Sequence, residues 1–308
     1  MSATETGTNR HPVVAYAMLV RLPNLFTSPP DVVLGAALGS IAVGGVSIES
    51  VAGLAFASIL LYAGGTTLND YFDAEEDARE RPERPIPSGD VSPEAALALG
   101  TVLLAGGVGV ALLAGGAIAG PTAGALALAV LLYDGVFKGS AVGFLFMGSS
   151  RGLNVLLGVA AVGVAPTDLP AWILAVPALV VLYIAGITYM AEGETETDGR
   201  GPVLAAVAGS TVAVFGVGAL LVARWPPIAV AGIVVVLLVA FIVWIGRPLR
   251  AAYADPAPDV VGPAVGACVL GLTILDAAIA AIAGVTWALA ILAFIVPAVG
   301  LSRVFDVT

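Results

Sequence analysis

Residues 226–246 read PPIAVAGIVVVLLVAFIVWIG, a run without one charged side chain. The hydrocarbon core of a bilayer is about 30 Å thick, and a helix needs roughly 20 apolar residues to cross it. A membrane β-barrel would instead show segments of about ten residues in which apolar and polar positions alternate. The stretch therefore predicts a transmembrane helix and indicates an all-α membrane protein.

Further segments share this length and apolar character. They lie near residues 30–47, 50–69, 94–116, 118–137, 141–163, 170–190, 201–223, 262–283 and 285–302. A very short turn joins the last two, so the sequence predicts nine or ten transmembrane helices. Hydrophobic residues make up 59% of the chain and charged residues 11%, against about 25% charged residues in a typical soluble domain. This composition excludes a soluble enzyme and a disordered chain, and we expect a single polytopic membrane domain over residues 1–308.

Lysine and arginine are distributed unevenly between the predicted loops. The loops near 47–50, 116–121 and 163–169 contain neither residue. If the N-terminus is cytoplasmic, the cytoplasmic side carries Arg10, Arg21, Arg79, Arg81, Arg84, Lys138, Arg200, Arg247 and Arg250. Because cytoplasmic loops carry the excess of basic residues, a cytoplasmic N-terminus is predicted. The start of the chain, residues 1–12, is expected to be a disordered cytoplasmic tail.

A dense group of charges begins at the end of the second predicted helix. Positions 69–90 hold 11 of the 34 charged residues. Asn69, Asp73 and Asp77 are spaced four residues apart, and Asp70 and Asp73 are three residues apart. Both spacings place side chains on the same face of a helix. A divalent cation would remove the repulsion between these carboxylates, and clustered oxygen ligands that bridge to phosphates are typical of Mg²⁺. The alternative interpretation is a solvated acidic loop.

A second acidic stretch, residues 192–200, follows the predicted helix 170–190. Glu194 and Asp198 form a carboxylate pair at four-residue spacing. A solvated loop is an equally good interpretation of this stretch alone. Between the two acidic regions, Tyr133 and Lys138 lie at the cytoplasmic end of segment 118–137, where Lys138 is suited either to bind a phosphate or to anchor the helix at the membrane interface.

Four further polar residues are candidates for substrate binding. Arg21 and Asn24 stand at the start of the first predicted helix, and Arg151 and Asn154 lie one turn apart within segment 141–163. An unpaired arginine inside a membrane is costly, so Arg151 is expected to face the bundle interior and to meet a carboxylate or an anionic ligand. A helix–helix hydrogen bond is the expected role of Asp276.

These residues carry a resemblance to a known family. NDYFDAEED at 69–77 resembles the N-D-x-x-D-x-x-x-D motif of the UbiA family of intramembrane prenyltransferases, and RPERPIPSG at 81–89 resembles the R-P-x-R-P-I-P-x-G continuation of that motif. The segments 21–24 and 133–138 also match in position. Details around Asn154 and Asp276 are similar to the EboC-like branch, and the first motif also looks like that of archaeal ether-lipid enzymes that add a second geranylgeranyl chain.

The resemblance implies an all-helical bundle around a central cavity, with two aspartate-rich motifs at its cytoplasmic mouth. It implies Mg²⁺ as the cofactor, a polyprenyl diphosphate as the donor, a lipophilic acceptor of unknown identity, and no nucleic-acid partner. The implied metal ligands are Asn69, Asp70, Asp73, Asp77, Glu194 and Asp198. Arg84 and Lys138 would contact phosphate oxygens, and Tyr133 would lie near the reacting allylic carbon. Glu194 departs from the family, whose second motif is usually D-x-x-x-D.

Two alternatives remain open at this point. A secondary transporter is compatible with ten helices and a possible internal repeat, but transporters place their charges near the bilayer midplane, whereas these carboxylates lie at one interface. A family member that binds isoprenoids without catalysis is compatible with the altered second motif. Inverted repeats would favour transport, whereas a parallel repeat with both acidic motifs on the cytoplasmic side favours the prenyltransferase.

Overall fold

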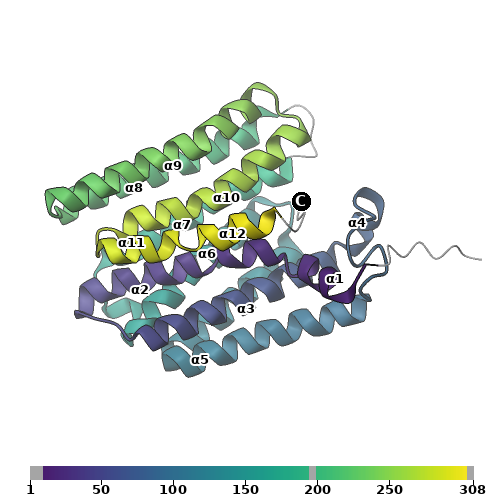
Figure 1. The fold of residues 1–308 in the computed structure, drawn as a ribbon, viewed down its shortest axis with the longest axis horizontal. Helices are drawn as coiled ribbons and strands as arrows, with labels where there is room; N and C mark the ends of the chain where they lie inside the picture. Colours follow the sequence, from purple (N-terminus) through teal and green to yellow (C-terminus); the bar gives the residue numbers. More distant parts are fainter. Residues whose placement is uncertain (1–9, 194–198, 304–308) are drawn as a thin grey trace, which may run out of the picture.

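The computed structural model describes residues 10–193 and 199–303, and all regular elements within them are helical (Figure 1). The α-helices are α1 (Pro12–Leu19), α2 (Pro29–Val43), α3 (Ile48–Phe72), α4 (Ala74–Glu80), α5 (Pro93–Leu132), α6 (Ala141–Val159), α7 (Ala171–Glu192), α8 (Arg200–Arg224), α9 (Ile228–Ala254), α10 (Pro258–Ala280), α11 (Val285–Leu292) and α12 (Ile295–Ser302). Four short turns complete them: the 3-10 turns η1 (Leu22–Thr27), η3 (Ala160–Val162) and η4 (Pro166–Asp168), and the π-helical turn η2 (Tyr133–Phe137).

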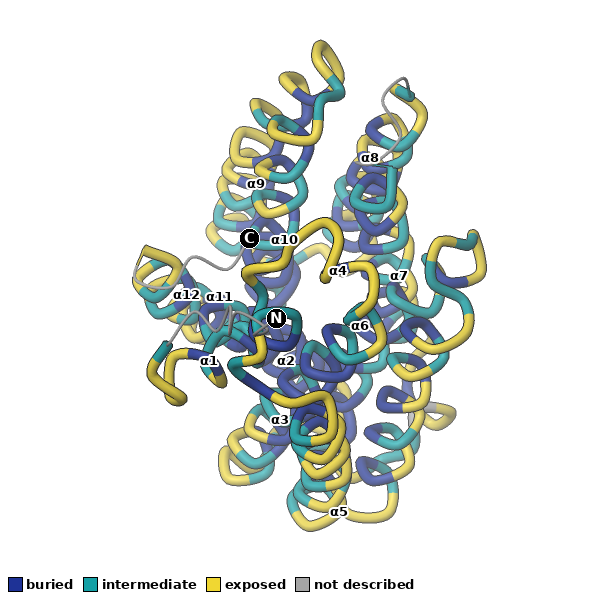
Figure 2. The backbone as a smooth tube through the Cα atoms, turned by 90° about the vertical axis from the view of Figure 1, so that its right-hand side faces the viewer, coloured by how far each residue is buried: buried dark blue, intermediate teal, exposed yellow. Residues whose placement is uncertain are grey.

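Nine helices in the described residues are long and apolar enough to cross a membrane. One of them, Pro93–Phe137, is 45 residues long and folds back at Gly116, whose φ of 68° and ψ of −153° leave the helical region. Gly64 of α3 lies against residue 100, while its neighbour Gly65 lies against Val130, so both halves of α5 run beside the same helix. The described part of the chain therefore crosses the bundle ten times. The described ends of α1 and α12 lie on the same side as α4 (Figures 1 and 2).

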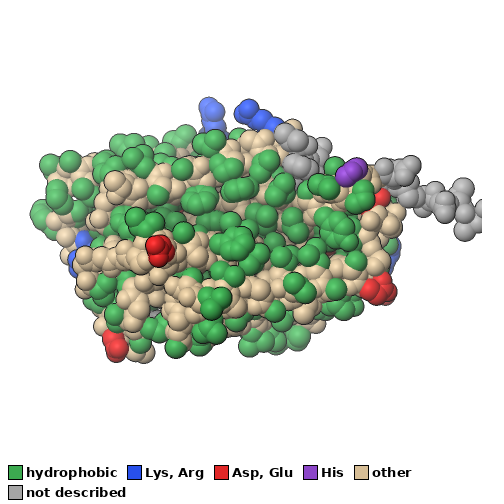
Figure 3. All heavy atoms as spheres, turned by 60° about the horizontal axis from the view of Figure 1, so that its bottom comes forward, with side chains coloured by type: hydrophobic (Ala, Val, Ile, Leu, Met, Phe, Trp, Pro, Cys, Tyr) green, Lys and Arg blue, Asp and Glu red, His purple; other side chains and the backbone are tan. Residues whose placement is uncertain are grey.

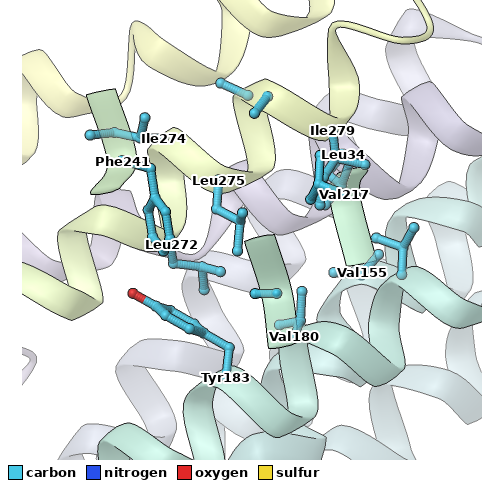
Figure 4. Packing of buried hydrophobic residues seen from close by; sticks show 14 of the residues in the cluster. Leu34, Val155, Val180, Tyr183, Val217, Phe241, Leu272, Ile274, Leu275 and Ile279 are labelled. Carbon is cyan, nitrogen blue, oxygen red and sulfur yellow. The ribbon is translucent and has the colours of Figure 1, made fainter. Parts of the chain in front are cut away.

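The core lies where α2, α6, α7, α9 and α10 meet (Figure 4). Backbones approach very closely between α2 and α6, because a Cβ on Gly35 would lie 1.9 Å from the carbonyl oxygen of Val155. Gly158 meets Val32 in the same way, at 2.0 Å. Such contacts hold membrane helices together by van der Waals packing, since lipid provides no hydrophobic force between helices. Gly35 and Gly158 thus form the packing surface between α2 and α6.

The outer surface of the bundle is apolar. Figure 3 shows hydrophobic side chains spread over the whole visible face, with only a few acidic side chains among them. Phe215 of α8 is 74% exposed and Val236 of α9 is 67% exposed. Large exposed apolar areas of this kind are expected where a protein faces lipid rather than water. The bundle is therefore an integral, multi-pass membrane protein, as the sequence predicts.

Residues 10–12, which the sequence predicts to belong to a disordered tail, are ordered in the structure. α1 begins at Pro12, and the side chain of His11 caps it by accepting a hydrogen bond from the amide of Val13. Arg10 forms an ion pair with Asp90, with Nη1 and Oδ2 3.1 Å apart. These contacts fix residues 10–12 to the bundle, while residues 1–9 lie outside the described part of the chain.

Candidate functional site

A cavity of about 420 Å³ opens at the end of the bundle where α4 lies. Figure 2 shows the position of α4 at this end. Its mouth is lined by charged side chains from α3, α4, η2 and the segment after α4. Its apolar walls come from residues such as Leu61, Leu126 and Val130. The cavity therefore joins a polar entrance to an apolar interior, an arrangement suited to a ligand with a charged head and a hydrocarbon tail.

Arg84 and Arg21 bind two carboxylates of the first acidic motif. Arg84 Nη1 donates to Asp77 Oδ2 at 2.7 Å and lies 3.5 Å from Asp70 Oδ1. Arg21 Nη2 donates to the same Oδ1 of Asp70 at 2.9 Å, and to Asn69 Oδ1 at 3.2 Å. Asp70 and Asp77 are buried, each with 5% of its surface exposed. The two arginines and two aspartates thus neutralise one another at the mouth.

The backbone at Arg21 is unusual for a residue with a side chain. Its φ of 51° and ψ of 57° are left-handed, a conformation that costs roughly 1–2 kcal/mol outside glycine. It turns the chain between α1 and η1. Desolvation is the largest single effect and opposes the charge of the guanidinium, but the attraction of Asp70, Tyr62 and Asp73 together outweighs it, so the pKa of Arg21 is raised above its ordinary value. Arg21 is therefore held cationic beside the acidic motif.

The turn η2 places a second set of polar groups at the mouth. Lys138 follows η2 and forms an ion pair with Asp73. Asp134 accepts a hydrogen bond at Oδ1 from Asn69 Nδ2, at 2.8 Å. Asp134 lines the cavity although only 8% of its surface is exposed. The end of α5 is thus bound to α3 through both Asn69 and Asp73.

Tyr133 lines the cavity from the first position of η2. Its hydroxyl donates to Glu192 Oε1 at 2.7 Å, and 5% of its surface is exposed. Glu192 is the last residue of α7 and also lines the cavity. This hydrogen bond fixes the ring of Tyr133 across the interface of α5 and α7.

Arg151 lies deeper, within α6, and finds the carboxylate that the sequence predicts. Its Nε is 3.2 Å from Oδ2 of Asp31 in α2, and its Nη2 donates to the carbonyl of Thr27 at 2.8 Å. Asn154 Nδ2 donates to Asp31 Oδ2 at 3.0 Å and to the carbonyl of Ser28. Asp276 of α10 is fully buried, but neither of its carboxyl oxygens has a hydrogen-bond partner among the described residues, so the helix–helix hydrogen bond expected from the sequence is not formed.

The cavity collects most of the residues expected from the sequence. Its lining includes Arg21, Asn69, Asp73, Asp77, Arg84, Tyr133, Lys138, Arg151 and Asn154. Asp70 lies behind this lining, where it binds Arg21 and Arg84. Asn24 lies in η1 and is not among the residues that line the cavity; its carbonyl oxygen accepts a hydrogen bond from Thr27 Oγ1. Glu194 and Asp198 lie outside the described residues.

Sequence reasoning missed three carboxylates that contact the site. Asp31 could have been found, since it stands at the start of the predicted span 30–47 and a buried arginine such as Arg151 needs a partner. Asp134 follows Tyr133 in a π-helical turn, whose spacing a period of 3.6 residues does not predict. Glu192 stands directly before the second acidic pair.

Mg²⁺ is compatible with this donor set, although the described carboxylates do not form a preassembled cage. Within residues 10–193 and 199–303, no three acidic, histidine or cysteine side chains converge closely enough to hold a metal. Instead a basic side chain separates Asp70 from Asp77, and another covers Asp73. Mg²⁺ usually takes one or two protein carboxylates and completes its shell with water and substrate phosphates. The oxygen donors at the mouth meet that requirement.

Curated relatives match part of the chain. A protein of Ignicoccus hospitalis named digeranylgeranylglyceryl phosphate synthase is 45% identical over 121 residues, which are 39% of this chain and 37% of the relative. The protein of the same name from Natronomonas pharaonis is 38% identical over 41% of this chain and 46% of the relative. The chain thus spans less than half of the length of these relatives.

Solved structures match the whole bundle at low identity. A digeranylgeranylglyceryl phosphate synthase structure superposes with a TM-score of 0.61 and 19% identity, over 89% of this chain and 99% of that one. A UbiA homologue from Archaeoglobus fulgidus bound to DMAPP and Mg²⁺ superposes with a TM-score of 0.61 and 14% identity, over 86% and 98%. Both likenesses establish a shared fold. Residues 29–254 match the model of the UbiA prenyltransferase family, and the chain belongs to that family.

Proposed function

We propose that this chain is an intramembrane prenyltransferase that moves a polyprenyl group from an allylic diphosphate to a lipophilic acceptor, with Mg²⁺ as cofactor. The observation that carries the proposal is the union of a charged mouth and an apolar cavity inside a membrane bundle. A prenyl diphosphate has the same two parts, a charged diphosphate head and a hydrocarbon tail. The names of the relatives and the family membership support the same reaction.

The ion pairs at the mouth indicate how the head would bind. Arg84 and Lys138 now bind carboxylates of the acidic motif. A diphosphate offers them more strongly charged oxygen acceptors, and arginine binds phosphate through paired hydrogen bonds. The released Asp73 and Asp77, with Asn69, would then hold Mg²⁺. The substrate and metal together would replace partners that the protein supplies to itself.

Departure of the diphosphate needs compensation of its developing negative charge. Bound Mg²⁺ would supply part of this compensation as a Lewis acid. Arg84 and Lys138 would supply the rest as fixed positive charges, which act strongly where water is excluded. Asp70 serves these residues indirectly, because it holds the guanidinium groups of both Arg21 and Arg84 in place.

The carbon centre left by the diphosphate is an allylic cation that water would destroy. The walls of Leu61, Leu126 and Val130 keep the cavity apolar next to the mouth. Tyr133, fixed by Glu192, supplies an aromatic ring whose face can stabilise a cation. Arg151 and Asn154 belong to the inner polar part of the lining, where we place contacts to the acceptor.

The acceptor and the orientation in the membrane are part of the proposal. The two curated relatives are named for digeranylgeranylglyceryl phosphate synthesis, which favours a glyceryl phosphate lipid as the first acceptor to try. Lysine and arginine at the mouth side favour a cytoplasmic mouth and N-terminus. Glu194 and Asp198, directly after the helix that ends at Glu192, would supply the second acidic motif.

The test is prenyl transfer by the purified protein. A radiolabelled donor, geranylgeranyl diphosphate, is incubated with geranylgeranylglyceryl phosphate, a quinone precursor or a tetrapyrrole, in Mg²⁺ or in EDTA. We expect labelled product with one acceptor and free diphosphate only when Mg²⁺ is present. Donor binding without release of diphosphate from the donor, whichever acceptor is present, would instead indicate a family member that only binds isoprenoids.

A further inference from the structure

A second hollow lies on the outside of the bundle, between α8 and α9. It has a volume of about 490 Å³ and is distinct from the cavity described above. Phe241 and Leu249 are buried and form part of its floor, while Leu204 and Phe215 are exposed at its sides. In Figure 2 the ends of α8 and α9 stand apart on the mouth side of the molecule. We call this hollow the α8–α9 groove.

The dimensions of the groove match one leaflet of a bilayer. On α8 it extends from Leu204 to Phe215, which is about 17 Å at a rise of 1.5 Å per residue. Half of a hydrocarbon core of about 30 Å is about 15 Å. The groove occupies the mouth-side half of both helices, since α8 begins and α9 ends on that side. Its lining is almost wholly apolar at the depth where lipid chains lie.

The end of the groove at the membrane surface is basic. Arg250 is exposed and lines the groove. Arg200, the first residue of α8, lies over the ring of Tyr253, with Cζ 5.2 Å from the ring centre. Tyr253 also lines the groove, so the stacked Arg200 is fixed at its entrance. Neither arginine belongs to the ion pairs that the described residues form.

An apolar channel of one leaflet's depth, with two arginines at its surface end, is complementary to a lipid with a negatively charged head. We propose that the α8–α9 groove binds a chain of an anionic, phosphate-headed lipid of the bilayer, with the phosphate at Arg200 and Arg250. Basic residues at the surface attract anionic lipids, and the apolar floor receives the chain. The bound lipid fills the space between α8 and α9 on the mouth side.

Binding is measured by native mass spectrometry of the delipidated full-length protein, with EDTA and without prenyl donor. Phosphatidylglycerol is compared with phosphatidylcholine of the same chains. We expect phosphatidylglycerol to bind more tightly. Arg250→Gln should weaken phosphatidylglycerol binding about fivefold and leave phosphatidylcholine binding unchanged. Arg303→Gln, which changes an exposed arginine at the mouth-side end of α12, should leave both unchanged.

A pair of glycine variants tests the place of the chain. Gly246 lines the groove and Gly232 does not, yet both are exposed on α9 and an added Cβ would meet no atom within 4 Å at either position. Gly246→Phe should weaken binding of both lipids about tenfold, and Gly232→Phe should not. Should Gly246→Phe fail to fold, the comparison of Arg250→Gln with Arg303→Gln still tests whether the groove binds the lipid.

Several results would overturn the proposal. Equal binding of the two lipids would remove the role of the arginines. Unchanged binding in Gly246→Phe would place the lipid elsewhere, and loss of a dimer in that variant would make the groove a contact between two copies. Displacement of the bound lipid by geranylgeranyl diphosphate, with Arg250 required, would make it a donor site. Each readout is independent of prenyl transfer.

Discussion

Asp73 is the most exposed of the carboxylates that form ion pairs in the described part of the chain. Its side chain keeps 12% of its accessibility, and that of its partner Lys138 keeps 30%. Partly solvated ion pairs contribute about 0–1 kcal/mol to stability. Asp77 and Asp70 differ, because each is more buried and each binds Arg84. A substitution of Asp73 is therefore expected to change activity with the least change in stability.

Asp73→Asn is expected to lower the rate of prenyl transfer about 10²–10³-fold, because a ligand for the metal and a neighbour of the diphosphate is lost. The melting temperature should stay within about 3 °C of the parent protein. Glu75→Gln is the matched control, since Glu75 is an exposed acid of α4 outside the cavity lining. Transfer and melting temperature are measured on the same preparations. Full activity in Asp73→Asn would refute the metal assignment.

Asp134→Asn is expected to slow transfer about tenfold while the protein stays folded. Asp134 binds Asn69 through one hydrogen bond, and an amide oxygen can still accept it. The missing charge would alter the mouth without removing a direct phosphate contact. An unchanged rate would show that the carboxylate of Asp134 serves packing alone. Donor KM and kcat, measured with Mg²⁺ in excess, distinguish weaker binding from slower chemistry.

Arg151→Met is expected to destabilise the protein by about 3–5 kcal/mol, because Asp31 would keep a buried charge without its cation. The double variant Arg151→Met with Asp31→Leu should regain most of that loss, since neither member of the ion pair is then left without its partner. Denaturation of both variants and of Asp31→Leu gives the coupling energy. Additive losses would contradict a direct ion pair.

At the scale of helices, the contact between α2 and α6 leaves no room for a side chain. Gly158→Ala would place a Cβ 2.0 Å from the oxygen of Val32, so the two backbones must separate. We expect a loss of about 3 kcal/mol or more and a low yield of folded protein. Gly109→Ala, an exposed site in α5 with open space around it, should be neutral or slightly stabilising. Thermal melting and monodisperse yield compare the two.

The elements show what a sequence can and cannot predict here. Continuous apolar runs such as 226–246 are long enough to specify helices from length alone, so the number and place of the spans were predictable. The fold at Gly116 was predictable too, because 94–116 and 118–137 are each long enough to span. By contrast, the sequence predicts one continuous helix over 285–302, whereas α11 and α12 form one span with a break at 293–294; Pro297 marks this break, because it cannot donate a hydrogen bond to the carbonyl of residue 293.

The site was predictable where chemistry is local and hidden where it depends on packing. Asn69, Asp73 and Asp77 lie on one helix, so their spacing placed them together. The partners Asp31 and Arg151 are 120 positions apart, and only the packing of α2 on α6 joins them. The burial of Asp70 behind the cavity likewise follows from Arg21 and Arg84, which come from two other segments.

At the scale of the whole molecule, folding and metal binding are expected to be independent. Asp70, Asp73 and Asp77 have basic partners within the protein, so the fold needs no cation to neutralise them. EDTA should abolish transfer and leave the melting temperature within about 2 °C. Donor and Mg²⁺ together should raise it, because a ligand of the folded state stabilises that state. A large drop in EDTA alone would indicate a structural metal.

The bond between Arg84 and Asp77 also bears on the end of each catalytic cycle. Inorganic diphosphate left behind after transfer must compete with a carboxylate attached to the same chain, at a high effective concentration. Each step in which Arg84 returns to Asp77, and Lys138 to Asp73, frees a phosphate contact without help from solvent. The carboxylates of Asp77 and Asp73 thereby displace the diphosphate from Arg84 and Lys138. We therefore expect inorganic diphosphate to be a weak product inhibitor.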